Sequence, residues 1–295
     1  MHNIKNSNNP LATKVMAKQY YQRQSLDPSK DKWNKKLQED AIVVEEPLQI
    51  NLSYFDLLSK QYQDKTLSIT LRTPGDDRAL IYGFLLCEGI INSKEDIIEC
   101  EFDTQQHQGN AVNVILAEHV QPDWKKIERQ FTSHSSCGIC GKTSLNALQL
   151  KAPNNVAEDK TTIDCQRIYQ LPELLREHQT IFSKTGGSHA AGLYCAEQFI
   201  ATSEDIGRHN AVDKVIGLNC LAETCHEKMI LVLSGRISFE LVQKAIMANI
   251  FIIVAVGAPS ALAVTAAKKF NVTLVGFTKR DSFNVYNGDW RIINE

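Results

Sequence analysis

Short apolar runs and amphipathic segments alternate most clearly in the last third of the chain. Three runs rich in β-branched residues, at 228–234, 251–257 and 271–277, predict buried strands. The segments between them, 238–250 and 260–270, carry apolar residues at helical spacing. A β-α-β-α-β order with right-handed crossovers makes a parallel sheet, and the continuous apolar strands indicate that helices cover both of its faces. This pattern predicts an α/β fold.

The first third of the chain has a different pattern. Apolar residues at 41–54, 65–73 and 110–117 predict strands. Between the second and the third of these strands, Asp76 and Asp77 are expected to cap a helix. The apolar face of that helix is formed by Leu80, Ile81, Phe84 and Leu85. The mixture of strands and helix predicts an N-terminal α+β lobe.

The middle of the chain alternates between helical and strand-like segments. Residues 142–150 and 171–186 have helical spacing, and the second segment ends at a Gly pair. Segments 189–197 and 198–205 alternate like the two strands of a hairpin, and 207–223 is again helical. We expect these elements to join the parallel unit in one α/β lobe.

Composition divides the chain into three parts. Residues 1–40 are polar and mixed in charge, so we expect a flexible arm with at most a short helix. Residues 41–130 are expected to form the N-terminal α+β lobe, and residues 131–295 the α/β lobe, which carries a closely spaced pair of cysteines. No internal repeat and no low-complexity tract is present.

The charge of the chain excludes some classes of partner. The net charge is -2 and the sequence pI about 6.5, so no broad basic field attracts nucleic acid or an anionic membrane. The uncharged stretch 245–267 is broken by Gly257 and Pro259, which favours a strand and a helix over a membrane span. The N-terminus lacks the apolar core of a secretory signal, and the eight scattered cysteines favour free thiols in a reducing cytoplasm.

The loops that follow the predicted parallel strands meet at one edge of the sheet, where ligands bind in such folds. They are 234–236, 257–260 and 278–282, and two of them lead into helix N-termini that favour an anion such as phosphate. Basic residues in the first and last loops add positive charge. Neither GxGxxG nor GxxxxGK[ST] occurs. The alternative is that these residues only cap helices and form turns.

Two earlier loops offer similar chemistry. Segment 183–189 combines Lys184, a Gly pair and His189. Segment 203–214 places charged residues at the start of a helix, namely Arg208, His209, Asp213 and Lys214. The alternative for both loops is structural, with Asp205 as a helix cap, paired charges and a satisfied histidine.

The stretch HSSCGICGKTSL holds Cys137 and Cys140, separated by two residues in a Gly-rich turn before a helical segment. A zinc site needs four ligands, and the other candidates are poorly spaced for one. Those candidates are Cys220, Cys225 and His226. A zinc deaminase needs H-x-E and P-C-x-x-C, but no histidine here is followed by x-E and Ser136 precedes the first cysteine. Deaminase chemistry is therefore excluded, although the deaminase fold is not.

Two thiol-based functions remain for the cysteine pair. A CxxC that opens a helix lowers a thiol pKa, as in disulfide oxidoreductases, although that motif follows an early strand in a small βαβ domain. The other function is a nucleophile that carries a group. Lys142 and His134 lie near the thiol in sequence and favour a thiolate, which accepts sulfur from another persulfide. The second thiol would protect or resolve the loaded sulfur.

Six segments of the chain, in order, resemble the FdhD/NarQ family of formate dehydrogenase accessory sulfur carriers. The segments are RTPGDDRALIYGFLLCEGII, SSCGICGK, SKTGGSHAAGL, EDIGRHNAVDKVIG, LSGRISFELVQKA and GAPSALAVTAAKKFNVTLVGFTKRDSFNVY. The resemblance covers residues 40–290 and leaves the N-terminal arm outside. It is specific because the six motifs occur in the family's order.

The resemblance implies a role for the cysteine pair. Cys137 would accept persulfide sulfur from a cysteine desulfurase, with Cys140 as the second thiol of the motif. The sulfur would pass to the bis-molybdopterin guanine dinucleotide form of the molybdenum or tungsten cofactor, which then enters the formate dehydrogenase catalytic subunit. The resemblance also implies a cytidine deaminase-like core. We further expect a homodimer, and GDP or GMP as a mimic of the cofactor.

The resemblance and the strand-end loops point to the same edge for the cofactor. The family's cofactor-binding segment matches 277–282, and the phosphates of a guanine dinucleotide suit the loops. The expected cofactor-binding residues are Lys184, His189, Ser234, Arg236, Gly257, Ser260, Phe277, Thr278, Lys279, Arg280, Asp281 and Ser282. We expect no metal held by the protein itself. Two other functions stay open, a cofactor-binding chaperone without sulfur transfer and a thiol–disulfide oxidoreductase.

Overall fold

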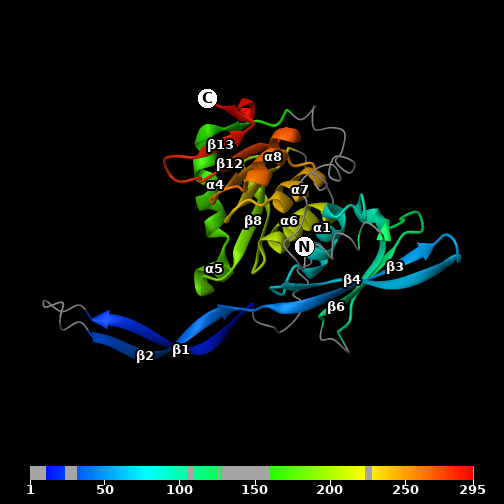
Figure 1. The fold of residues 1–295 in the computed structure, drawn as a ribbon, viewed down its shortest axis with the longest axis horizontal. Helices are drawn as coiled ribbons and strands as arrows, with labels where there is room; N and C mark the ends of the chain where they lie inside the picture. Colours follow the sequence, from blue (N-terminus) through cyan, green and yellow to red (C-terminus); the bar gives the residue numbers. More distant parts are fainter. Residues whose placement is uncertain are drawn as a thin grey trace.

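The chain folds into two lobes, each built on a β-sheet, with a separate two-stranded hairpin (Figure 1). The structure is a computed structural model that describes residues 11–23, 32–104, 109–124, 127, 160–222 and 228–294. The architecture is mixed α/β, as the sequence predicts. The specific likeness to the cytidine deaminase fold stays a prediction.

The C-terminal lobe contains a six-stranded sheet in the order β13-β12-β11-β10-β8-β9. Its strands are β8 (His189–Cys195), β9 (Gln198–Asp205), β10 (Ile230–Leu233), β11 (Ile252–Ala255), β12 (Thr273–Gly276) and β13 (Asn284–Asn287). Strands β10, β11 and β12 are parallel, which confirms the predicted β-α-β-α-β unit. Strands β8 and β13 extend this unit on either side as antiparallel neighbours.

Helices cover both faces of this sheet because successive strand residues point to opposite sides. The helices are α4 (Cys165–Glu177), α6 (Arg208–Leu221), α7 (Phe239–Met247) and α8 (Ala261–Lys269). Leu231 and Ile253 join the core under α6, α7 and α8, whereas their neighbours Val232 and Val254 join the core under α4. The continuous apolar runs in the sequence therefore reflect burial on both faces.

The segment 171–186, predicted as one helix, forms the end of α4 and a separate short helix, α5 (Thr180–Thr185). The chain breaks between them at 178–179, because the carboxylate of Glu204 accepts hydrogen bonds from Ile181 N and Phe182 N at the start of α5. Helix α5 ends as predicted at the Gly pair, where Gly186 adopts φ 65°.

The N-terminal lobe contains a four-stranded sheet in the order β4-β3-β6-β5, with the helix α1 packed on one face. These elements are β3 (Glu46–Asp56), β4 (Gln61–Arg72), α1 (Asp77–Cys87), β5 (Ile97–Phe102) and β6 (Ala111–Leu116). The buried face of α1 includes Leu80, Ile81 and Leu85, as predicted, while Phe84 is partly buried. The two-stranded sheet of β7 (Ile163–Asp164) and β14 (Ile292–Ile293) and the 3-10 turns η2 (Lys94–Asp96) and η4 (Asp289–Arg291) complete the described elements.

The expectation that two aspartate side chains cap α1 is wrong. Asp76 is the N-cap residue, but its side chain makes no capping bond and instead accepts a hydrogen bond from the Ser203 hydroxyl. Asp77 accepts two hydrogen bonds from the buried guanidinium of Arg72. Both carboxylates are therefore recruited by tertiary partners that the local pattern does not show.

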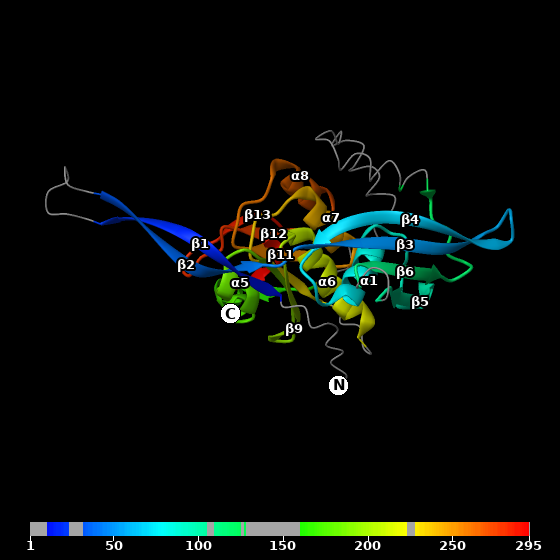
Figure 2. The same ribbon diagram turned by 90° about the horizontal axis from the view of Figure 1, so that it is seen from below.

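The N-terminal arm is not an irregular segment with a short helix where the structure describes it. Strands β1 (Ala12–Arg23) and β2 (Lys32–Val43) pair antiparallel, with Ala12 opposite Val43. The hairpin projects from one end of the molecule, and the β3–β4 hairpin projects from the other (Figure 2). The base of β2 packs on the end of α5, where a Cβ on Gly187 would lie 2.9 Å from Val43 Cγ1.

The two lobes meet where α1 crosses α6 at very short range. A Cβ on Gly83 would lie 1.8 Å from the carbonyl oxygen of Asp213, and one on Gly217 would lie 1.8 Å from the carbonyl oxygen of Ala79. Only glycine permits backbones to approach this closely. The relative position of the lobes is therefore set by backbone contact.

Two buried ion pairs reinforce this contact between the lobes. Lys214 Nζ lies 2.8 Å from the carboxylate of Asp205 and donates to the carbonyl of Thr73 in the N-terminal lobe. Lys244 Nζ lies 2.7 Å from the carboxylate of Asp213 and 3.8 Å from that of Glu88, at the end of α1 in the N-terminal lobe, and the side chains of Lys244 and Asp213 are buried. We call the α1–α6 crossing and these two pairs the interlobe seam. The uncharged stretch 245–267 contains the end of α7, strand β11 and most of α8, and no helix among the described residues is long and apolar enough to cross a bilayer.

Candidate functional site

A groove of about 620 Å³ lies at the carboxyl ends of the parallel strands, where the strand order predicts a ligand site. Its walls come from α4, from α5 and the Gly pair behind it, and from the loops after β10, β11 and β12. We call it the strand-end pocket. Five of the predicted cofactor-binding residues line it, namely His189, Ser234, Thr278, Lys279 and Arg280.

Close contact between the loops after β10, β11 and β12 positions their lining residues, Val256 and Thr278 among them. Gly257 N donates to the carbonyl of Gly235, and a Cβ at Gly257 would lie 2.8 Å from that same carbonyl group. Phe277 then adopts a left-handed conformation, with φ 52°, and its N–H donates to the carbonyl of Gly257. This sharp turn directs the next residue, Thr278, into the pocket wall.

Thr278 carries a buried hydroxyl in the wall of this pocket. The residue is 3% exposed, and its Oγ1 has no hydrogen-bond partner within the described part of the chain. Leaving such a group unsatisfied costs about 1–3 kcal/mol, and native proteins rarely tolerate it without a reason. A ligand with a polar atom in the pocket would supply the missing partner.

Positive charge predominates along the described lining. Arg176, Lys279 and Arg280 contribute three cations, and Glu173 is the one carboxylate among the described lining residues. Arg280 Nε and Nη2 donate to the two oxygens of Glu173 at 3.0 and 2.9 Å. This bond lowers the pKa of Glu173 and raises the pKa of Arg280, so both stay charged at neutral pH. The lining therefore suits an anion with more than one negative charge.

His189 lies at the first residue of β8, against the loop that follows β10. A Cβ on Gly235 would lie 3.2 Å from its Nδ1. Burial lowers the pKa of His189, the charges of Arg208 and Arg236 lower it further, and Asp205 opposes them. The imidazole is therefore neutral at pH 7 and is available as a donor or acceptor rather than as a fixed cation.

Ser234 links β8 to the same loop. Its Oγ accepts a hydrogen bond from Ala190 N at 2.8 Å, so its position is set by the backbone of β8. The hydroxyl proton is left to donate to an acceptor in the pocket. The pocket thus combines hydroxyls with side-chain cations, a combination that suits phosphate.

The other predicted cofactor-binding residues do not line the pocket. They are Lys184, Arg236, Gly257, Ser260, Phe277, Asp281 and Ser282. Ser260 Oγ accepts from Ala263 N and caps α8, which is the structural alternative that the sequence left open. Asp281 and Ser282 are exposed and bond to one another. Gly257 and Phe277 position their neighbours Val256 and Thr278 through their backbones, while Lys184 and Arg236 are exposed.

The sequence left the roles of the charged residues at the start of α6 open, and the structure gives these residues different partners. Asp213 and Lys214 belong to the interlobe seam. Asp205 pairs with Lys214, and its Oδ1 also accepts hydrogen bonds from Gly207 N, at the N-cap of α6, and from Asn210 Nδ2 in the first turn. His209 Nε2 lies 3.2 Å from the Ser238 hydroxyl. None of these residues lines the strand-end pocket.

Sequence reasoning missed the helical wall of the pocket. Tyr169, Glu173 and Arg176 are spaced by four and three residues on α4, so they share one helical face. The Arg176 guanidinium lies 4.1 Å from the ring of Phe182 in α5. The helical spacing was visible in the sequence, but nothing local indicated that this face meets the strand-end loops.

Cys137 and Cys140 lie outside the described residues, as do His134, Lys142, Cys225 and His226. Among the described cysteines, Cys87 and Cys100 are poor nucleophiles because burial raises the pKa of both thiols, that of Cys100 to about 11. No group of three or more possible metal ligands occurs in the described part of the chain. The zinc alternative therefore gains no support from these residues.

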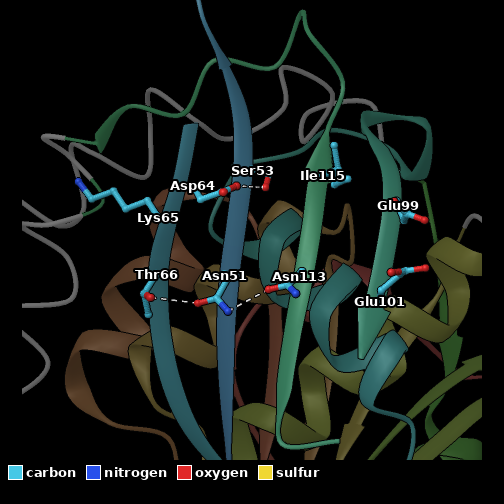
Figure 3. Close-up of a pocket in the computed structure, with 9 residues that line it drawn as sticks. All are labelled: Asn51, Ser53, Asp64, Lys65, Thr66, Glu99, Glu101, Asn113 and Ile115. Atoms are coloured by element: carbon cyan, nitrogen blue, oxygen red, sulfur yellow. Dashed lines mark hydrogen bonds between the residues drawn. The ribbon is translucent and has the colours of Figure 1, made fainter. Parts of the chain in front are cut away.

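A second hollow, of about 450 Å³, lies on the open face of the N-terminal sheet (Figure 3). Asn51 donates to Asn113 and accepts from Thr66, so polar side chains on three strands bond to one another. Among the described lining residues, the three carboxylates of Asp64, Glu99 and Glu101 outnumber the cation of Lys65. An anionic cofactor therefore suits the strand-end pocket and not this hollow.

Comparison with known proteins shows similarity to one family along most of the chain. A sequence model of the FdhD/NarQ family matches residues 43–293. The chain is 40% identical over 263 residues to the sulfur carrier protein FdhD of Mycobacterium tuberculosis, covering 86% of this chain and 92% of that protein. It is 41% identical over 260 residues to that of Nocardia farcinica, covering 86% and 88%.

A solved structure shares the fold. It is the crystal structure of a putative formate dehydrogenase accessory protein from Desulfotalea psychrophila, with a TM-score of 0.68 at 21% identity. The alignment covers 96% of this chain and all of that one. The N-terminal hairpin is therefore largely within the shared architecture, although the family sequence match begins only at residue 43.

Proposed function

The chain belongs to the FdhD/NarQ family, and from that membership we propose that it is a sulfur carrier in the maturation of formate dehydrogenase. Cys137 takes persulfide sulfur from a cysteine desulfurase. The sulfur then passes to the bis-molybdopterin guanine dinucleotide cofactor, held in the strand-end pocket as the protein's substrate. The relatives named sulfur carrier protein FdhD support a sulfur-carrier role in general.

The observation that carries the cofactor part of the proposal is the lining of the strand-end pocket. It joins a buried hydroxyl that lacks a partner in the described residues, at Thr278, with the cations Lys279 and Arg280. Phosphate oxygens accept from hydroxyls, ammonium groups and guanidinium groups alike. On the opposite wall, Tyr169 and the Arg176 guanidinium, which lies over the ring of Phe182, offer flat groups on which a ring system could stack.

The proposed loading of Cys137 is a thiol exchange. Its thiolate attacks the outer sulfur of the desulfurase persulfide, forms a new S–S bond and releases the desulfurase cysteine as a thiolate. Delivery as sulfide needs two electrons. Cys140 supplies them when its thiolate attacks the inner sulfur, expels the outer atom as sulfide and leaves a Cys137–Cys140 disulfide. An external dithiol then reduces that disulfide and restores the pair.

Sulfur loading tests the carrier role directly. After incubation with a cysteine desulfurase and cysteine, mass spectrometry is expected to find one additional sulfur on the peptide that contains Cys137. Cys137→Ala should abolish the loading and the support of formate dehydrogenase, whereas Cys165→Ala, in a half-buried described cysteine, should change neither. Full support by the Cys137 variant would mean that the protein acts as a cofactor-binding chaperone.

Cys140 tests the delivery step. Cys140→Ala should still accept sulfur at Cys137 but release less sulfide, because the thiol that resolves the persulfide is missing. A variant that unfolds, with wild-type protein holding about one zinc per chain, would identify the pair as a structural clip instead. Rapid reduction of insulin disulfides by the wild-type protein would favour the oxidoreductase function.

A further inference from the structure

The ion pair between Glu173 and Arg280 spans the strand-end pocket. Glu173 lies on the α4 wall, and Arg280 lies on the loop after β12, which forms the facing wall. The residues are 107 positions apart in the sequence and make two hydrogen bonds, of 3.0 and 2.9 Å. Any ligand that uses Arg280 therefore meets a carboxylate that already occupies it.

Glu173 and a phosphate group would use the same donors of Arg280. The carboxylate engages Nε and Nη2, which is the side of the guanidinium that binds two oxygens of one anion. A phosphate that binds this same edge must displace the carboxylate, whereas one that does not is left with the Nη1 hydrogens and the second Nη2 hydrogen, beside the negative charge of Glu173. The two anions are therefore in competition.

The pair is exposed enough to open readily. The side chain of Arg280 is 85% exposed and that of Glu173 is 56% exposed. Exposed pairs of this kind contribute little to stability because water and salt screen them. The pair therefore weakens ligand binding at Arg280 only modestly and does not prevent it.

The other two cations of the lining are not held by a carboxylate in this way. Arg176 lies over the ring of Phe182, and Lys279 has no ion pair within the described residues. Arg280 alone among the described lining cations faces an internal competitor. The Glu173 pair therefore weakens the contact that Arg280 offers a ligand and leaves the other two described lining cations unaffected.

We propose that Glu173 is an internal competitor for the phosphate of the bound cofactor, and that it sets how tightly and how long the pocket holds its ligand. The inference rests on the proposed function of the strand-end pocket. A protein that hands its cofactor on needs release as well as capture, and a carboxylate that returns to Arg280 favours release. Glu173 acts through Arg280, so it is a positioning residue of the site.

Calorimetry with three probes tests this role, using GDP, inorganic phosphate and guanosine. Glu173→Gln keeps the shape of the side chain and removes its charge. It is expected to tighten GDP and phosphate binding by about two- to fivefold and to slow GDP dissociation by a similar factor, while guanosine binding is unchanged. The matched control, Glu177→Gln, removes the same charge from α4 outside the pocket and should have a smaller effect.

A double-mutant cycle separates competition from a general change in charge. In an Arg280→Gln background, Glu173→Gln should no longer tighten GDP binding, because the donor for which the two anions compete has been removed. The gain from Glu173→Gln should also fall as salt rises from low to high concentration. A gain that persists without Arg280 would overturn the proposal.

Other outcomes are equally decisive. Weaker binding of both GDP and guanosine to the Glu173→Gln variant would show that Glu173 contacts the base, and unchanged binding of all three probes would show that it does not compete. If wild-type protein bound neither GDP nor phosphate, the pocket itself would be misassigned and this inference would fall with it. If wild-type protein binds GDP while Glu173→Gln behaves like wild type, only the inference fails.

Discussion

The interlobe seam and the strand-end pocket use the same chemistry for opposite purposes. Each pairs a cation with a carboxylate across two elements, Lys244 with Asp213 in the seam and Arg280 with Glu173 at the pocket. The seam pair is buried, and its side chains are 8% and 3% exposed. The pocket pair stands largely in water. Burial, and not the presence of an ion pair, decides which of the two is structural.

The protonation states of the interlobe seam and of the strand-end pocket also differ. Burial raises the pKa of Asp213 to about 6, even though the charge of Lys244 opposes the rise. Burial alone would lower the pKa of Lys244, but the carboxylates of Asp213 and Glu88 raise it. Both members of the seam pair are therefore charged at pH 7. At the pocket, the lowered pKa of His189 leaves a neutral group that gains charge only in acid.

The largest expected effect comes from breaking the seam. Lys244→Met removes the cation and leaves the Asp213 carboxylate buried without its partner. Loss of one member of a buried pair costs about 3–5 kcal/mol, so the free energy of unfolding in urea should fall by that amount. The double variant Lys244→Met with Asp213→Leu should recover part of the loss, since no buried charge is left unpaired. A single variant as stable as wild type would contradict a structural role for the pair.

Breaking the pocket pair should affect binding and not folding. Arg280→Ala is expected to weaken GDP binding in calorimetry by about ten- to hundredfold, because a charge-assisted contact to phosphate is lost. The urea midpoint should stay close to that of wild type, since the pair is exposed. Sulfur loading at Cys137 should also persist. If unfolding and binding were both impaired, the contrast between the two regions would be wrong.

The buried hydroxyl at the pocket offers a finer test. Thr278→Val keeps the shape of the side chain and removes the hydroxyl that lacks a partner in the described residues. Stability should be unchanged or higher, because an unsatisfied polar atom is replaced by an apolar one. GDP binding should weaken about two- to tenfold if that hydroxyl donates to the ligand. A variant that loses stability without losing affinity would mean that the hydroxyl serves the fold.

The smallest effect is a pH dependence of binding. His189 has a lowered pKa because of burial and the charges of Arg208 and Arg236, so it is neutral at pH 7. Bound phosphate would stabilise the protonated imidazole, and GDP affinity should therefore rise as pH falls from 7 to 5, by about twofold more than in a His189→Gln variant. Comparison at each pH removes the titration of the phosphate itself. Parallel profiles for the two proteins would show that His189 does not contact the anion.

Local pattern predicted much of the C-terminal lobe correctly. The runs at 228–234, 251–257 and 271–277 contain strands β10, β11 and β12, and their parallel order placed the loops of Ser234 and Thr278 at one edge. The prediction was correct because the strands of a parallel sheet are covered by helices on both faces. Strands that are buried on both faces have continuous apolar sequences. The hairpin of β8 and β9 was also predicted, because the alternation of a strand depends on neighbouring residues in the sequence.

Residues distant in sequence decided the rest. Glu173 and Arg280 are 107 positions apart, and Thr73 N bonds to the carboxylate of Asp205 across 132 positions. The sequence left open whether Lys214 and Asp213 serve a ligand or pair structurally, and both are buried because α1 crosses α6 through Gly83 and Gly217. Periodicity reports which face of an element is apolar, but it does not name the element that will cover that face.

The sequence by itself determined the family motifs, the parallel unit and the edge at which the strand-end loops meet. Tertiary structure decided that α4 and α5 complete the pocket, that β1 and β2 pair in a hairpin, and that Ser260 caps a helix instead of lining the site. The physical reason is that hydrogen bonding within a helix and the alternation of a strand depend on near neighbours, whereas the partner of an exposed carboxylate such as Glu173 depends on which distant loop the whole fold brings within 3.0 Å.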